Sequence, residues 1–158
     1  MNDLVVAIIL GRKGSKGVRD KNTMDILGRP AFFYPLLAAN NSEYIDKTFV
    51  STDHETIIDG AKEMGIPIIT RPDSLCTDEA LFEDALIHAY FKIKEIIGGQ
   101  PKYIVVLMCN AVTINSQLID VDNKISHARE VDEKLESVEA MLSSAQVQVQ
   151  ESIYELTN

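Results

Sequence analysis

The sequence predicts an α/β fold, a three-layer sandwich with a mostly parallel central sheet, followed by an amphipathic helix towards the C-terminus. Short apolar runs rich in β-branched residues alternate with segments of helical pattern, and such alternation requires crossover connections. The first run, residues 4–10, is apolar at every position, which is typical of a strand buried on both faces of a parallel sheet. With 158 residues, 46% of them hydrophobic, the chain can bury one sizeable core.

The elements follow in a regular order. The predicted strands are residues 4–10, 47–51, 66–69 and 103–108, and the predicted helices are residues 31–40, 54–64 and 78–97. Pro30 is suited to the start of the first helix, whereas Gly65 and Gly98 are placed to end the second and third helices. The fourth strand is expected to be buried like the first.

The C-terminal segment has a different pattern. We expect residues 1–119 to form the α/β domain and residues 120–158 an acidic helical tail. Apolar residues recur there at alternating spacings of three and four, which gives a narrow seam: Ala128, Val131, Leu135, Val138, Leu142, Ala145 and Val149. Such a helix can pack on its own domain or pair with another chain, so a homo-oligomer is one expectation.

Composition excludes several classes of protein. The net charge of −9 argues against binding to nucleic acid polymers or anionic membranes. No run approaches the length of a membrane span, and the start of the chain has no cationic leader. The cysteines, Cys76 and Cys109, lie too far apart for a C-x-x-C metal or redox motif. These features favour a soluble cytoplasmic protein.

One short segment is strongly basic. Residues 11–22 contain five basic residues and one acidic residue, whereas residues 120–158 contain three basic and nine acidic residues. The segment begins Gly-Arg-Lys-Gly-Ser-Lys-Gly directly after the first strand, where ligands bind in open α/β sheets. Glycines allow a close approach of the backbone, Arg12 can grip phosphate oxygens as a fork, and Lys16 supplies a point charge. The spacing is neither that of a Walker A loop nor that of a dinucleotide fingerprint, and a solvated basic turn is the alternative.

Three ordered motifs resemble those of a known family. The run from Ala7 to Asn22 is similar to the signature of the cytidylyltransferases that activate 2-keto sugar acids, which include the CMP-sialic acid (acylneuraminate) synthetases and their relatives for other nonulosonic acids and for KDO. Residues 44–53, ending in Ser-Thr-Asp, and residues 71–78, Arg-Pro-Asp-Ser-Leu-Cys-Thr-Asp, agree in order and spacing. The resemblance covers about residues 4–120.

This resemblance implies a nucleotide-diphospho-sugar transferase-like (Rossmann-like) domain and a reaction in which a sugar acid attacks the α-phosphate of CTP, with magnesium assisting. It implies that Arg12, Lys16 and Lys21 hold the triphosphate and act in catalysis. The nucleotide-binding residues implied by the family pattern are Leu10, Gly11, Arg12, Gly14, Ser15, Lys16, Gly17, Lys21, Asn22 and Arg71. The implied residues of the substrate rim are Ser51, Thr52, Asp53, Asp78 and Asn110.

Several of these residues also have structural interpretations. Asp53 and Asp78 each lie at the start of a predicted helix, so each is also a candidate N-cap, and capping is the favoured role for Asp78, with its helix beginning near Glu79. Asn110 follows the fourth strand in a segment that lacks the Gln-Pro-Thr-Ser-Pro-like sequence of the sialic acid synthetases, which favours a divergent relative. Cys109 is expected to be a buried strand-end cysteine rather than a nucleophile.

The metal site is the least specific expectation. Ile-Asp-Val-Asp at residues 119–122 resembles a late metal motif of the family, and Asp120 and Asp122 could hold magnesium if the segment is extended. In a helix the two carboxylates diverge, and the alternative is a solvated acidic turn. The three histidines, His54, His88 and His127, are scattered and are expected to be ordinary surface or core residues.

Three functions are compatible with the sequence. The leading hypothesis is a cytidylyltransferase that transfers CMP from CTP to a 2-keto acid sugar and releases pyrophosphate. The second is a shortened, catalytically weak or inactive nucleotide-binding module that oligomerises through its C-terminal helix. The third keeps the fold but uses a sugar phosphate as the acceptor.

Overall fold

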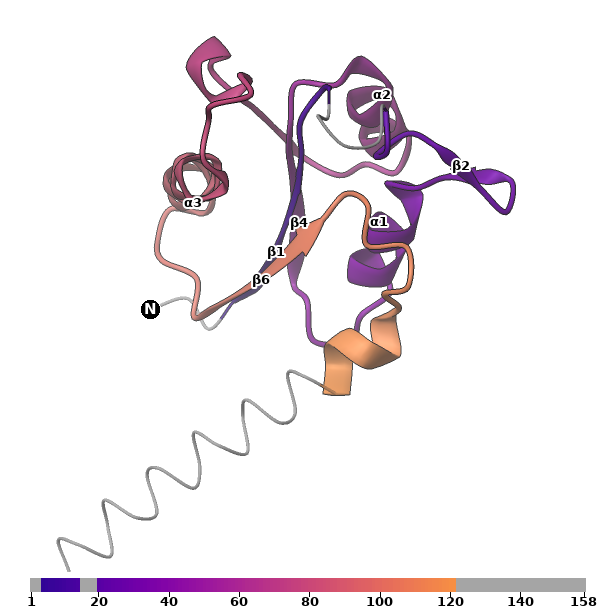
Figure 1. Ribbon diagram of the computed structural model, residues 1–158. Coiled ribbons are helices and arrows are strands. Elements are labelled where there is room, and N and C mark those ends of the chain that lie inside the picture. Colours follow the sequence, from indigo (N-terminus) through magenta and orange to yellow (C-terminus); the bar gives the residue numbers. More distant parts are fainter. Residues whose placement is uncertain (1–3, 15–19, 122–158) are drawn as a thin grey trace, which may run out of the picture. The chain divides into compact units, whose positions relative to one another are not determined.

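The computed structural model describes residues 4–14 and 20–121 and confirms the predicted α/β class (Figure 1). The chain divides into two units, Met1–Asp120 and Val121–Asn158. The first contains every element described below, and the predicted helical seam of residues 128–149 lies outside the described residues. Within the described residues, no helix is long and apolar enough to cross a membrane.

The central sheet has four parallel strands. They are β1 (Val5–Gly11), β4 (Lys47–Thr52), β5 (Ile68–Thr70) and β6 (Tyr103–Met108), in the spatial order β5-β4-β1-β6. Ile8 of β1 lies opposite Phe49 of β4 and Val106 of β6. Because β1 lies between two strands and under helices on both faces, its uninterrupted apolar sequence is almost completely buried, as predicted.

Helices cover the two faces of the sheet. On one face lie α1 (Phe33–Asn40) and α2 (Glu55–Glu63), and on the other lies α3 (Phe82–Ile97) (Figure 1). The first face buries Ile9, Leu36 and Ile57 among others, whereas the second buries Ile8, Phe49 and Ala89. The described residues therefore form the three layers that the sequence predicts.

The order of the strands creates a switch point. The connections from β1 to β4 and from β4 to β5 run through α1 and α2 on one face, whereas the connection from β5 to β6 runs through α3 on the other. The crossovers therefore change faces between β1 and β6. In open α/β sheets, ligands bind at such a point, outside the carboxyl ends of the strands. The basic loop begins there, directly after β1.

The end of α2 confirms the role predicted for a glycine. Gly65 has a φ of +68° and its N–H donates to the carbonyl of Lys62, while the N–H of Ile66 donates to Ala61. These two bonds form a Schellman motif, which requires the left-handed conformation that glycine adopts without strain. Gly98, with a φ of +67°, ends α3 in the same left-handed conformation.

The predicted start of the third helix is wrong by four residues. The helix begins at Phe82 rather than at residue 78, because residues 73–80 form the short helix η1 (Asp73–Leu75) and turns. Leu81 is the N-cap residue in an extended conformation, and its side chain is 62% exposed. Helical periodicity does not detect this boundary, because the apolar residues before Phe82 face a pocket rather than the sheet.

The fourth strand has the predicted bounds but not the predicted burial. Ile104, Val106 and Met108 are 37%, 38% and 42% exposed. In the described part of the chain β6 is an edge strand, and α3 packs against β1 and β4 on that face. An apolar sequence does not distinguish an edge strand from an inner strand, and the difference follows from strand order.

A short hairpin precedes α1 and was not predicted. It consists of β2 (Asp25–Ile26) and β3 (Arg29–Pro30), joined by Leu27 and Gly28. Pro30 therefore ends β3, and the helix starts three residues later, at Phe33. The Asp25 carboxylate accepts a hydrogen bond from the N–H of Gly28 and closes the turn.

Candidate functional site

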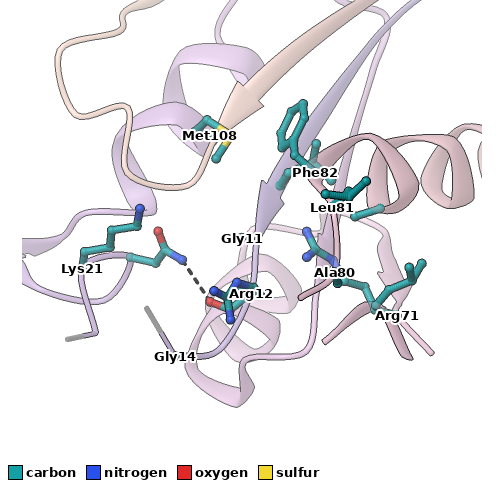
Figure 2. A pocket seen from close by; sticks show the side chains of 13 residues that line it. Gly11, Arg12, Gly14, Lys21, Arg71, Ala80, Leu81, Phe82 and Met108 are labelled. Atoms are coloured by element: carbon teal, nitrogen blue, oxygen red, sulfur yellow. Dashed lines mark hydrogen bonds between the residues drawn. The ribbon is translucent and has the colours of Figure 1, made fainter. Parts of the chain in front are cut away.

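A pocket of about 160 Å³ lies at the carboxyl ends of β1 and β6. A cavity of roughly 150 Å³ holds one benzene ring, so this pocket has room for one aromatic ring and opens to solvent beyond it. Figure 2 shows Lys21 on one side of Arg12 and Ala80, Leu81 and Phe82 on the other. The lining residues are Leu10, Gly11, Arg12, Gly14, Lys21, Asn22, Arg71, Leu75, Ala80, Leu81, Phe82, Ala85 and Met108.

The structure brings together the described part of the predicted nucleotide site. All the described residues of that prediction line the pocket: Leu10, Gly11, Arg12, Gly14, Lys21, Asn22 and Arg71. Ser15, Lys16 and Gly17 lie outside the described residues. Arg71 lies far from the loop in sequence, and it reaches the pocket because it follows β5, whose carboxyl end lies at the same edge of the sheet.

Arg71 is a buried cation with fixed orientation. Its side chain donates from Nε to Ser51 Oγ (3.0 Å) and from Nη2 to the carbonyl oxygen of Ser51 (2.9 Å), and the residue is 7% exposed. Burial lowers the pKa of Arg71, and the charge of Asp53 opposes this effect. Since the ordinary pKa of arginine is above 12, the guanidinium remains charged at neutral pH. The pocket therefore has a permanent positive charge at its wall.

The Ser-Thr-Asp motif lies behind the pocket rather than on its rim. Ser51 and Thr52 are completely buried at the end of β4, so the predicted rim position of these two residues is corrected. Ser51 holds Arg71, and Thr52 Oγ1 accepts a hydrogen bond from the N–H of His54. The motif thus supports the site from within the sheet.

Neither predicted N-cap aspartate caps a helix. His54 is the N-cap of α2, and its Nδ1 accepts from the N–H of Thr56 (3.3 Å). Asp53 instead accepts from the N–H of Lys13 (2.6 Å). Asp78 precedes α3 by four residues and pairs with Arg12, with 2.6 Å between Oδ1 and Nη1. Both carboxylates therefore contact the basic loop.

The start of the loop is also packed closely against Cys109, the residue that follows β6. A Cβ atom built on Gly11 would lie 2.3 Å from Cys109 Sγ, so only glycine fits beside this cysteine. Cys109 is completely buried, and burial raises its pKa to about 12. The thiol is therefore protonated at neutral pH, which makes it an unsuitable nucleophile, as the sequence indicates.

Several apolar lining residues were missed by the sequence analysis. They are Leu75, Ala80, Leu81, Phe82, Ala85 and Met108. Ala80, Leu81 and Ala85 were assigned to the buried face of a longer helix. Met108 alone had a signal in the sequence, because it ends a predicted strand. In the structure this strand lies beside β1, and the carboxyl ends of both strands lie at the switch point, where ligands bind.

The remaining predicted residues lie elsewhere. Asn110 is exposed and does not line the pocket. Asp120 lies in a helical segment, residues 116–121, and accepts a hydrogen bond from the hydroxyl of Ser42. Since Ser42 precedes β4, Asp120 lies towards the amino ends of the strands, away from the basic loop. Asp122 and His127 lie outside the described residues, and His88 lies on α3.

The described residues do not form a protein cage for a metal ion. Across residues 4–14 and 20–121 there is no group of three histidine, cysteine or acidic side chains placed to bind one. Of the acidic residues near the loop, Asp53 contacts a backbone N–H and Asp78 contacts a guanidinium. What the pocket does offer is a ring-sized space with apolar walls and three cationic side chains, a combination that suits an aromatic ring attached to an anion.

Sequence comparison connects the chain to known enzymes. The family model described as Cytidylyltransferase matches residues 6–154. The chain is 37% identical over 89 residues to the N-acylneuraminate cytidylyltransferase of Escherichia coli O18:K1:H7 and 41% identical over 83 residues to that of Streptococcus agalactiae serotype III. These matches cover 56% and 51% of this chain but only 21% and 20% of the relatives, so the chain spans about a fifth of their length.

Structural comparison finds the same fold. The CMP:2-keto-3-deoxy-manno-octonic acid synthetase in complex with CTP superimposes with a TM-score of 0.61 at 19% identity, over 75% of this chain and 45% of that one. A cytidylyltransferase from Leptospira borgpetersenii gives a TM-score of 0.56 at 21% identity, over 77% of this chain and 48% of the other.

Proposed function

This chain belongs to the cytidylyltransferase family, and we propose that it binds CTP in the pocket between β1, β6 and α3 and transfers CMP to a 2-keto acid sugar with release of pyrophosphate. The observation that carries the proposal is the convergence of Arg12, Lys21 and Arg71 on a ring-sized pocket at the switch point of the sheet. The basic segment of residues 11–22 supplies Arg12 and Lys21, and the distant segment after β5 supplies Arg71, whereas a solvated basic turn does not require such an arrangement.

The walls of the pocket suggest how the nucleotide lies. Leu81, Phe82 and Met108 supply apolar surface suited to the faces of a base. Asn22 is 7% exposed, and its Nδ2 donates to the carbonyl oxygen of Arg12 (3.1 Å). This bond fixes the amide beside the loop, where its oxygen can accept from an exocyclic amine such as that of cytosine. Arg12 and Lys21 then face the phosphates.

The proposed chemistry is an in-line displacement. The anomeric hydroxyl oxygen of the sugar forms a bond to the α-phosphorus, the bond from that phosphorus to the bridging oxygen of the β-phosphate breaks, and the hydroxyl proton passes to solvent water. Negative charge then grows on the departing pyrophosphate. Arg12 and Lys21 line the pocket and would stabilise that charge, and such stabilisation is the principal contribution a protein makes to phosphoryl transfer.

Magnesium is part of the proposal as an ion carried on the phosphates. When bound, it would offset charge on the phosphate oxygens. Because the described residues offer no cluster of metal ligands, no step above depends on a protein-bound ion. A titration of magnesium during CTP binding, with the Asp120→Asn variant as a comparison, tests whether the predicted Asp120 and Asp122 site is needed.

The direct test measures binding and turnover separately. CTP, UTP, GTP and ATP are titrated by calorimetry with magnesium present, and pyrophosphate release is followed with a panel of 2-keto acid sugars. We expect selective binding of CTP and release of pyrophosphate with at least one sugar acid. Binding without release with any sugar acid would support the nucleotide-binding module instead, and release with a sugar phosphate would support the third function. If no nucleotide binds, the proposal is wrong.

A matched pair of variants links the signal to the pocket. Arg12→Ala should weaken CTP binding about 10- to 100-fold, since hydrogen bonds to charged groups contribute roughly 1.5–3 kcal/mol. Arg29→Ala removes the same charge from the exposed hairpin and should leave affinity nearly unchanged. Equal losses in both variants would show that only the overall charge matters.

A further inference from the structure

We propose that Asp53 and Asp78 are positioning residues that hold the start of the basic loop in the conformation that binds phosphates. This inference rests on the proposed function, because it takes the ligand to be a polyphosphate. It gives a common role to the carboxylates that end two of the sequence motifs, Ser-Thr-Asp53 and the segment from Arg71 to Asp78.

Three side chains from separate segments converge on two consecutive residues. Asn22 donates to the carbonyl oxygen of Arg12 (3.1 Å), Asp53 accepts from the N–H of Lys13 (2.6 Å), and Asp78 pairs with the guanidinium of Arg12 (2.6 Å). Asn22 ends the basic segment of residues 11–22, whereas Asp53 follows β4 and Asp78 follows η1. The two aspartates thereby hold the Lys13 N–H and the Arg12 side chain from outside the basic segment.

The contact between Arg12 and Asp78 orients the guanidinium but occupies only part of its hydrogen-bond donors. It engages Nη1, and a guanidinium has five N–H donors, so Nε and Nη2 can still face an anion. The Arg12 side chain is 27% exposed and lines the pocket. A long cationic side chain loses rotamer entropy when it binds a ligand, and holding it beforehand reduces that loss.

Asp53 connects the loop to the second cation. Its carboxylate accepts from the Lys13 N–H, and its charge acts on Arg71, whose pKa it raises against the effect of burial. Arg71 is itself held by Ser51 at the end of the strand that leads into Asp53. Asp53 therefore holds the loop by a hydrogen bond and acts on the buried arginine through its charge.

The alternative role for these carboxylates is competition with the ligand. A negative charge beside an anion site repels the anion, so removal of the carboxylate would then tighten binding. If the carboxylates act by positioning, their removal should weaken binding. The affinity gained from an Arg12 side chain that is already held in place must then exceed the repulsion. The sign of the change therefore decides between the two roles.

The test uses the full chain and inorganic tripolyphosphate, titrated by calorimetry. Asp78→Asn should weaken binding about two- to tenfold, the range expected for losing one preset long side chain. Glu79→Gln, at the exposed neighbouring residue, removes the same charge and should leave binding unchanged or slightly tighter. Asp78→Glu should recover part of the affinity, and thermal melting establishes that each variant is folded.

If Asp78 acts by positioning Arg12, the effect of Asp78→Asn on binding should depend on Arg12. A general loss of structure would not depend on that residue. In an Arg12→Ala background, Asp78→Asn should have a smaller effect than in the wild type, whereas Asp53→Asn, which acts on Lys13 and Arg71, should weaken binding as before. The proposal is overturned if Asp78→Asn binds as tightly as Glu79→Gln, or if its effect is undiminished without Arg12. A wild-type chain that binds neither tripolyphosphate nor CTP would instead refute the proposed function.

Discussion

Gly11 and Cys109 show how single residues shape the site. The absence of a side chain at Gly11 lets the Cys109 sulfur pack against the loop, and a Cβ there would lie 2.6 Å from Cys109 Cβ. Burial of the thiol has a second consequence, because a buried group resists ionisation. The pKa of Cys109 rises from 9.0 to about 12.

This shift predicts a loss of stability at alkaline pH. Between pH 9 and 12 the thiol ionises in the unfolded chain but stays protonated in the folded protein, so the unfolded state binds fewer protons. The free energy of unfolding should therefore fall as the pH rises above 9, by up to about 1.4 kcal/mol per pH unit for this residue. Below pH 9 the thiol is protonated in both the folded and the unfolded state, so it does not make the free energy of unfolding depend on pH.

Urea denaturation of the wild type and of Cys109→Ala at pH 7 to 10.5 measures this effect. The stability difference between the two proteins should narrow as the pH rises, because the variant lacks the titrating thiol. Cys76→Ala is a graded comparison: burial also raises the pKa of Cys76, but this residue is only partly buried, so the narrowing should be smaller than for Cys109→Ala. A constant difference between wild type and Cys109→Ala across the range would contradict the shift.

At the scale of elements, position in the sheet matters more than local sequence. Val6 of β1 and Val106 of β6 both lie in apolar strands on the face covered by α3, yet Val6 is 0% and Val106 is 38% exposed. Strand propensity does not separate them, because both sequences are rich in β-branched residues. Only the order β5-β4-β1-β6, with β6 at the edge of the described sheet, accounts for the difference.

The same substitution in the two strands should have unequal effects. Val6→Thr places a hydroxyl in the core and should lower the free energy of unfolding by about 1–3 kcal/mol. Val106→Thr should cost less than about 0.5 kcal/mol, because its side chain is partly in water. Chemical denaturation of both variants measures the contrast. Similar losses would indicate that β6 is covered in solution.

Across the whole molecule, local patterns predict the elements, and tertiary contacts decide the details. The four strands, three helices and the basic loop follow from apolar periodicity, glycines and charge. The start of α3 and the roles of Asp53 and Asp78 do not, because each depends on a contact between distant segments. A helix-start carboxylate looks the same in sequence whether it caps the helix or pairs with Arg12.

The sequence did not predict the apolar walls of the pocket, for a related reason. Leu81 and Phe82 fit a helical pattern, and the sequence does not show that the helix starts late and leaves them facing the loop. Arg71, in contrast, was identified by its motif, and its burial against Ser51 gives that motif a physical basis. Prediction was therefore best for the charged part of the site and weakest for the apolar part.

Self-association is the remaining expectation at this scale, and it concerns residues outside the described part of the chain. The 3-4 spacing of apolar residues from Ala128 to Val149 predicts a seam that pairs with a second copy. If it does, light scattering should give a mass above that of the 17.6 kDa monomer, and Leu135→Lys with Leu142→Lys should reduce it to the monomer. Ser137→Lys with Ser144→Lys adds the same charge off the seam and should leave the oligomer intact. A monomeric wild type, or an oligomer that survives the leucine substitutions, would show that the seam does not mediate association between copies.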